Sequence, residues 1–124
     1  MQERMKQNYR CGVEITLEVI GGKWKGLILW HLRERTLRFS QLKRRLNGVT
    51  QKMLTRQLRD LEEDGLIHRK VYAQVPPKVE YSLTATGQGV VPILQMMCTW
   101  GTDYAAQNPT PHAEEMCGTE QARA

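Results

Sequence analysis

The stretch SQLKRRLNGVTQKMLTRQLRDLEEDG, residues 40–65, consists of two amphipathic segments joined by a short turn. In the first segment Leu42 and Leu46 recur at helical spacing, and Ser40 stands where a side chain can cap a helix. The Asn-Gly pair at 47–48 interrupts this pattern, because these two residues favour a tight turn. A second helical segment follows directly. The stretch therefore predicts helix, short turn and helix, the order of a helix-turn-helix motif.

The second of these helices is predicted to begin at Thr50, whose hydroxyl can cap the first turn, and to end at Gly65. Its leucines repeat every three or four residues and define a stripe that must face a core. Glutamine and arginine can bind base edges through paired hydrogen bonds, whereas lysine and threonine suit phosphates or the thymine methyl group. These residue types occupy the outward positions Gln51, Lys52, Thr55, Arg56 and Arg59.

The positive charge of the chain is concentrated around this motif. The 124 residues carry a formal net charge of +5, and residues 33–59 contain nine Lys and Arg side chains against a single acid, Glu34. Four acids then follow between residues 60 and 64. A basic segment of this kind is the electrostatic footprint that a phosphate backbone requires. The charge pattern alone fits a solvated surface without a partner equally well, so the neighbouring elements must decide.

Two alternating segments follow the motif and predict a β-hairpin. Residues 66–73 and 78–83 carry apolar side chains at alternate positions, and residues 74–77 contain two adjacent prolines that suit a stiff tip. A hairpin that follows a helix-turn-helix is the order of elements in a winged helix. We expect this hairpin to present Arg69 and Lys78 to a nucleic-acid backbone or minor groove.

Helices are predicted on both sides of this unit. Short helices over 14–20 and 23–35 precede it, and a long helix capped by Thr84 extends to about residue 106. The last helix is apolar around most of its circumference, so a second copy of the chain is its natural partner. Pro92 within it predicts a kink. The predicted fold class is mainly α with a small β-hairpin (α+β), a winged helix-turn-helix with flanking N- and C-terminal dimerisation helices.

We predict one domain over residues 11–107, with a flexible N-terminal arm over 1–10 and a flexible C-terminal tail over 108–124. The chain shows neither a run of about 18 apolar residues nor a secretory signal, which favours the cytoplasm and no membrane partner. Its three cysteines have neither CxxC spacing nor a nearby pair of histidines, so no metal site is expected. No cofactor is expected either, and the chain is not expected to be an enzyme.

The chain resembles the HxlR family of winged helix-turn-helix regulators, which are related to the MarR regulators. The resemblance extends over about residues 11–104 and is carried by Cys11, GGKWKGLILWHL (21–32), RFSQLKRRLNGVTQKMLTRQLRDLEEDGLIHRKVY (38–72), VPPKVEYSLTATG (75–87) and the pair Trp100-Gly101. It implies a homodimer assembled through the first and last helices. It also implies a recognition helix at about 50–64 and a wing at about 68–82 that face double-stranded operator DNA.

Several members of the family resemble redox switches, in which a cysteine just before the first helix senses oxidants, quinones or aldehydes. Cys11 occupies that position and is the candidate sensor. Cys98 is expected on a buried helix, whereas Cys117 on the tail could reach a neighbouring subunit. A Cys11–Cys117 disulfide between subunits is therefore a hypothesis. The alternative is a Cys11 thiol that simply packs at the dimer interface.

The chain is thus predicted to be a sequence-specific DNA-binding transcription regulator, with repression favoured over activation, that acts as a homodimer on an inverted-repeat operator. Modification of Cys11 by an oxidant or electrophile is one predicted trigger, and a small-molecule ligand is the alternative. A winged helix that serves protein interaction is the remaining, disfavoured class. The residues predicted to bind DNA are Ser40, Lys43, Arg44, Gln51, Lys52, Thr55, Arg56, Arg59, Arg69 and Lys78.

Overall fold

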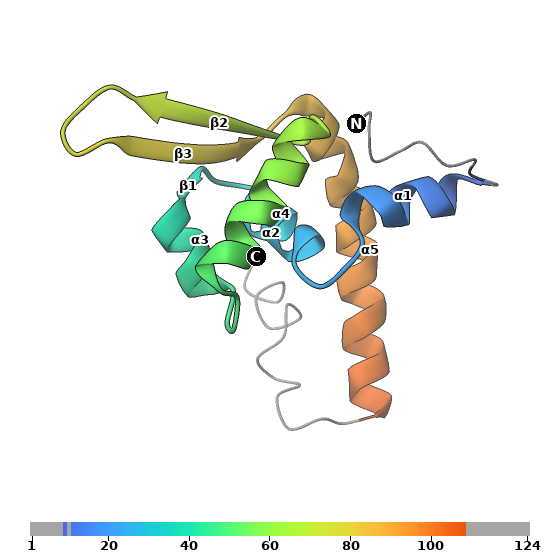
Figure 1. Ribbon diagram of the computed structural model, residues 1–124. Coiled ribbons are helices and arrows are strands. Elements are labelled where there is room, and N and C mark those ends of the chain that lie inside the picture. Colours follow the sequence, from blue (N-terminus) through green and yellow to red (C-terminus); the bar gives the residue numbers. More distant parts are fainter. Residues whose placement is uncertain (1–8, 10, 109–124) are drawn as a thin grey trace. The chain divides into compact units, whose positions relative to one another are not determined.

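The computed structural model describes Tyr9 and residues 11–108. Its helices and strands are α1 (Gly12–Ile20), α2 (Lys25–His31), β1 (Leu37–Arg38), α3 (Phe39–Arg45), α4 (Gln51–Glu63), β2 (Ile67–Tyr72), β3 (Lys78–Leu83) and α5 (Ala85–Gln107) (Figure 1). The chain divides into two compact units, one reaching to Gly89 and the other starting at Val90. The predicted arm and tail lie outside the described residues, apart from Tyr9 and Asn108.

The core of the first unit is built where α2 packs against α3 and α4. Ile28 and Leu29 of α2, Leu42 of α3, and Leu54 and Leu61 of α4 are all 0% exposed. Full burial of such a side chain stabilises the fold by about 1.5–3 kcal/mol relative to exposure. The leucine spacing that predicted both helices of the motif is therefore confirmed by the packing.

The three strands form one antiparallel sheet in the order β1-β3-β2. Leu37 of β1 and Arg69 of β2 both pair with Tyr81 of β3, and Lys70 of β2 pairs with Glu80. We call the β2–β3 hairpin the wing; Figure 1 shows it extending beyond α3 and α4. The winged helix-turn-helix of α+β class is thus confirmed, and a short strand, β1, precedes the motif.

The start of α3 differs from the prediction. The N-cap is Arg38, and its backbone N–H donates to Gln41 Oε1 at 2.8 Å. Ser40 lies inside the first turn of the helix, so its prediction as the N-cap is wrong. The side chain of Gln41 reaches back to the preceding strand residue and begins the helix one residue earlier than Ser40.

The end of α2 also differs, because the helix stops at His31 and not near residue 35. The N–H of Leu32 donates to the carbonyl oxygens of both Ile28 and Leu29 at 3.1 Å, which tightens the last turn. Arg33 then covers the helix end. Its Nη1 donates to the carbonyl oxygen of Trp30 at 2.7 Å, and its guanidinium carbon lies 3.8 Å from the centroid of the Trp30 ring.

Two threonine caps are confirmed. The N–H of Met53 donates to Thr50 Oγ1 at 3.1 Å and begins α4. The N–H of Gly87 donates to Thr84 Oγ1 at 3.0 Å, and this hydroxyl donates to the carbonyl oxygen of Gly65 at 2.7 Å. Gly65 adopts a φ of 83°, which only glycine reaches without strain. Thr84 therefore joins the start of α5 to the turn that ends α4.

The second unit contains the part of α5 that begins at Val90. Leu94, Cys98 and Ala105 of this part of the helix are buried. The large apolar side chains that remain exposed are Ile93, Met96, Met97, Trp100 and Tyr104. Within residues 9 and 11–108, no helix has both the length and the apolar character needed to cross a membrane.

Candidate nucleic-acid interface

Helix α4 exposes a continuous polar row. Leu54, Leu58 and Leu61 are buried and fix the rotation of the helix about its axis. The opposite side consists of the five residues that we call the reading face, all of them exposed: Gln51, Lys52, Thr55, Arg56 and Arg59. The predicted outward residues are thus exposed together, at the N-terminal and central turns of the helix.

An ion pair between a buried lysine and a partly exposed aspartate connects α4 to α2. Lys25 is 8% exposed, and its Nζ lies 3.7 Å from Asp60 Oδ2. A buried ammonium group is costly without an acidic partner, so this contact holds the two helices in register. Sequence reasoning missed this pair, because Lys25 and Asp60 are 35 positions apart in the chain.

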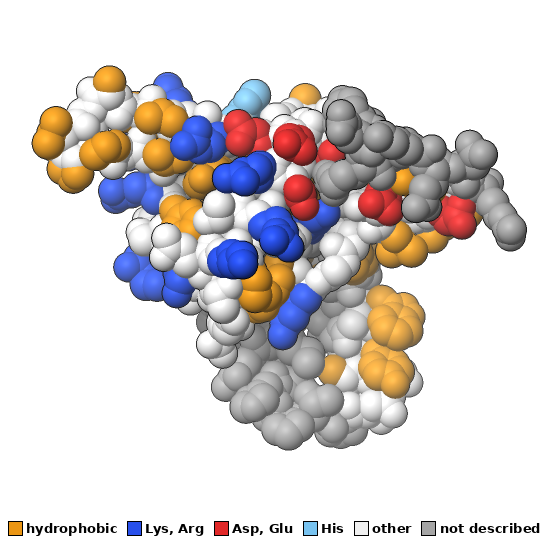
Figure 2. Space-filling model, viewed as in Figure 1, with side chains coloured by type: hydrophobic (Ala, Val, Ile, Leu, Met, Phe, Trp, Pro, Cys, Tyr) orange, Lys and Arg blue, Asp and Glu red, His pale blue; other side chains and the backbone are white. Residues whose placement is uncertain are grey.

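The side chains of α3 add positive charge beside the reading face. Lys43, Arg44 and Arg45 are exposed on its last turn, and Ser40 is exposed on its first. Figure 2 shows blue side chains gathered over the region of α3, α4 and the wing, with red side chains toward the C-terminal end of α4. The first helix of the motif is therefore as suited to a polyanion as the second.

The register of the sheet separates the two wing residues that the sequence analysis grouped together. Successive side chains of a strand point to opposite faces. Arg69 lies on the face of Ile67 and Tyr81, which are buried, and we call this the inner face of the wing. Lys78 pairs with Tyr72 on the opposite, outer face. The signal was available, because Arg69 shares the alternation of the apolar positions in its strand.

The outer face of the wing carries a compact charged cluster. The Tyr72 hydroxyl donates to Glu80 Oε1 at 2.8 Å, and Lys78 Nζ lies 3.3 Å from Glu80 Oε2. The Nζ atoms of Lys70 and Lys78 lie 4.9 and 4.8 Å from the centroid of the Tyr72 ring. The hydrogen bond from Tyr72, together with the nearby charges of Lys78 and Arg38, lowers the pKa of the Glu80 carboxyl. Lys78 is thus held by an ion pair and a ring contact, which the sequence did not predict.

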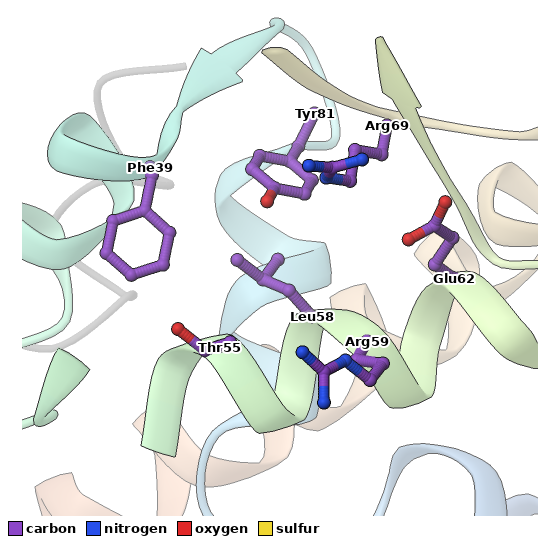
Figure 3. Close-up of a pocket in the computed structure, with 7 residues that line it drawn as sticks. All are labelled: Phe39, Thr55, Leu58, Arg59, Glu62, Arg69 and Tyr81. Atoms are coloured by element: carbon purple, nitrogen blue, oxygen red, sulfur yellow. The ribbon is translucent and has the colours of Figure 1, made fainter. Parts of the chain in front are cut away.

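A pocket of about 390 Å³ lies between α4 and the inner face of the wing. We call it the α4–wing pocket, and it is lined by Phe39, Thr55, Leu58, Arg59, Glu62, Arg69 and Tyr81. Figure 3 shows Leu58 near the Phe39 and Tyr81 rings, with Arg59 and Glu62 on α4 and Arg69 on the wing. Arg59 of α4 and Arg69 of β2 therefore belong to one site, although the sequence analysis assigned them to separate elements.

Cys11 is exposed, carries a free thiol and stands at the N-cap of α1. Its carbonyl oxygen accepts the N–H of Glu14 at 3.1 Å. Cys98 of α5 is 5% exposed, as expected for a buried helix position. Cys117, predicted as a partner of Cys11, lies outside the described residues. No group of three or more His, Cys, Asp or Glu residues suited to a metal ion occurs in the described part of the chain.

Known proteins match this chain over most of its length. The family model described as HxlR-like helix-turn-helix matches residues 19–109. An uncharacterised HTH-type transcriptional regulator of Bacillus subtilis, YkvN, is 51% identical over 115 residues, which cover 93% of this chain and 98% of YkvN.

Two solved structures resemble the fold. The redox regulator HypR in its oxidised form has a TM-score of 0.72 and 54% identity, covering 75% of this chain and 96% of that chain. The reduced form of the transcriptional regulator YodB from B. subtilis has a TM-score of 0.66 and 31% identity, covering 83% and 98%. The helix-turn-helix, the wing and the matched residues all indicate the same family. The chain belongs to the HxlR-like helix-turn-helix family of transcriptional regulators.

Proposed function

We propose that the chain is a homodimeric, sequence-specific DNA-binding regulator, with the reading face of α4 in the major groove. The observation that carries this proposal is the exposure of the five reading-face residues beside the exposed basic turn of α3. Buried leucines hold α4 so that no apolar side of this helix competes for another protein surface. This arrangement disfavours a protein-interaction winged helix, which would expose an apolar or acidic helix.

Binding would use two kinds of contact, with phosphates and with base edges. Lys43, Arg44 and Lys52 would neutralise phosphates and provide affinity that is independent of sequence and falls with salt. Gln51 and Arg56 would bind base edges, where each good bidentate pair discriminates by about 1–3 kcal/mol. The acids at the far end of α4 would keep that end away from the backbone. A regulator with this division acts in the cytoplasm, where the DNA is, and performs no reaction of its own.

A homodimer is supported by apolar side chains in each unit considered separately. In the second unit Met96 is 73% exposed and Trp100 is 67% exposed, and the Trp100 and Tyr104 rings stack with centroids 5.1 Å apart. In the first unit α1 exposes Val13 and Leu17. A second copy would cover these helices and display two reading faces. Twofold symmetry then requires an inverted-repeat operator, with half-site centres about 34 Å apart.

A salt titration tests the DNA-binding proposal. Fluorescence anisotropy with a random-sequence duplex between 50 and 200 mM salt should show affinity that falls steeply, because each neutralised phosphate contributes about 0.9 to the logarithmic slope. Lys52→Gln should lower the slope by about 0.9. Lys23→Gln removes the same charge outside α3, α4 and the wing and should leave the slope unchanged. A flat titration of the wild-type chain would exclude the proposal.

A redox trigger at Cys11 is the second proposal, and the exposed free thiol at the start of α1 favours it. Oxidation beside the expected dimer helices would alter the spacing of the two reading faces. HypR is described as a redox regulator. YodB is described as a transcriptional regulator and has been solved in a reduced and a diamide-treated form. A small-molecule inducer is the alternative trigger.

Diamide treatment separates these triggers. If Cys11 is the sensor, diamide should cross-link the wild-type chain on non-reducing gels and change its affinity for DNA, and Cys11→Ser should abolish both effects. Cys117→Ser should abolish the cross-link only if the predicted Cys11–Cys117 disulfide forms. A Cys11→Ser chain that still responds fully to diamide would rule out Cys11 as the sensor. A wild-type chain that does not respond to diamide would leave the small-molecule inducer as the trigger.

A further inference from the structure

The α4–wing pocket brings together two guanidinium groups from different elements. Arg59 projects from the reading face of α4, and Arg69 projects from the inner face of the wing. Figure 3 shows Arg69 beside the Tyr81 ring and Arg59 along α4, with Leu58 between the two side chains. Tyr81 and Leu58 are buried, so the floor of the pocket is fixed while both arginines remain exposed.

Neither guanidinium makes an ion pair with any residue that the structure describes. The pocket contains two arginines against a single carboxylate, Glu62, so it keeps a net positive charge that a bound anion would neutralise. A guanidinium group presents a planar fork of N–H donors that matches the oxygens of a phosphate. The pocket is therefore suited to a single phosphate group held from two sides.

The position of the pocket indicates which phosphate this is. When a recognition helix enters the major groove and a wing reaches the adjacent minor groove, one DNA strand must pass between the two elements. The α4–wing pocket lies between these two elements, where that strand would pass. We propose that Arg59 and Arg69 bind one and the same backbone phosphate of that strand. The inference rests on the proposed DNA-binding function and assigns Arg69 to the recognition-helix site, not to a separate wing contact.

The other polar residues of the pocket limit how the phosphate is held. Thr55 Oγ1 donates its hydrogen to the carbonyl oxygen of Gln51 at 2.8 Å, so this hydroxyl is not a free donor for the phosphate. Glu62 lies one turn beyond Arg59 and repels an anion. The two arginines are therefore the donors. Glu62→Gln should strengthen binding to every duplex, because it removes the repulsion without changing the length of the side chain.

The test is a phosphate scan on a duplex that the wild-type chain itself enriches from a random library. Each backbone phosphate is replaced in turn by a neutral methylphosphonate, and the affinities of wild type, Arg59→Gln, Arg69→Gln and the double variant are compared. At one position per half-site, the replacement should weaken wild type about tenfold and leave the double variant unchanged. Lys78→Gln, on the outer face of the wing, should keep the wild-type sensitivity at this position.

The salt dependence gives a second reading of the same variants. The double variant should lose about 0.9 of the logarithmic slope, the value for one phosphate, whereas two separate phosphates would give about 1.8. Equal unfolding temperatures verify that the variants fold. The inference is overturned if Arg59→Gln and Arg69→Gln abolish the effect of methylphosphonate replacement at different phosphates. It is also overturned if Arg69→Gln binds as tightly as wild type. A wild-type chain without salt-dependent binding would instead overturn the proposed function itself.

Discussion

Helices α4 and α5 distribute their side chains in opposite ways. Helix α4 buries its leucines and exposes Gln, Lys, Thr and Arg, whereas α5 exposes Met96, Met97 and Trp100. The polar side of α4 is complete without a protein partner and is suited to a polyanion. Exposure of the apolar side of α5 to water is unfavourable, so this side is suited to another apolar surface. This contrast is what the proposed function requires, with DNA bound by the first helix and a second copy of the chain bound by the other.

The largest expected effect is on the buried side of α4. Leu54→Ala should lower the free energy of unfolding by about 2–5 kcal/mol, because the side chain is 0% exposed and leaves a cavity. Met53→Ala, at the adjacent and 38% exposed position, is the control and should change it by about 0.5 kcal/mol. Denaturant unfolding at one fixed protein concentration measures both. Equal losses would mean that α4 is not oriented by its leucines.

The exposed side of α5 gives the next effect. Trp100→Asp should raise the dimer dissociation constant at least a hundredfold, or about 2.8 kcal/mol, because a charge is placed in an apolar contact. Thr102→Asp adds the same charge at an exposed polar position of the helix and serves as the control. Sedimentation equilibrium provides the measurement. A Trp100→Asp chain that dimerises like wild type would remove α5 from the interface.

The reading face of α4 should respond more specifically. Arg56→Ala should weaken binding to the enriched duplex by about 1–3 kcal/mol and relax the preference at one base position, if Arg56 binds a guanine edge. Binding to random duplexes should fall less. Competition titrations with both duplexes measure the difference. Equal losses on both would show instead that Arg56 contacts only phosphate.

The smallest effect concerns the outer face of the wing. The pKa of Glu80 lies below its ordinary value of 4.5 in the folded chain, so this group stabilises the fold above that pH. The stabilisation is lost as the pH falls from about 4.5 through the lowered pKa of the folded state. Glu80→Gln should therefore make unfolding slightly less dependent on pH in this acidic range. An unchanged acid profile would mean that the Tyr72 hydrogen bond does not persist in solution.

Local patterns were sufficient to predict most of the fold. The leucine repeat predicted which side of α4 is buried. Thr50 and Thr84 cap their helices as predicted. The predicted cap at Ser40 failed because Gln41, a residue further along, reaches back to Arg38. The choice between two neighbouring polar side chains depends on the three-dimensional path of the preceding strand.

The site was predicted less completely than the fold. The residues of the reading face follow from helical periodicity alone, and all of them are exposed. The pairing of Arg59 with Arg69 depends on how the wing packs beside α4, and the Lys25–Asp60 ion pair depends on the contact between two helices. Long-range contacts of this kind leave no periodic trace in a sequence. Glu80 and Tyr72 lie opposite the basic residues of the wing only because of the strand register.

Selection of binding sites from a random duplex library tests the central claim most directly, because it involves both helices of the comparison. The account predicts an enriched inverted repeat whose half-site centres are about 34 Å apart. Each half-site would be bound by the α4 helix of one copy, and the two copies would be joined through α1 and α5. Arg56→Ala should lose the preference at one symmetric pair of positions. Enrichment of no sequence, or of a site without twofold symmetry, would contradict the account.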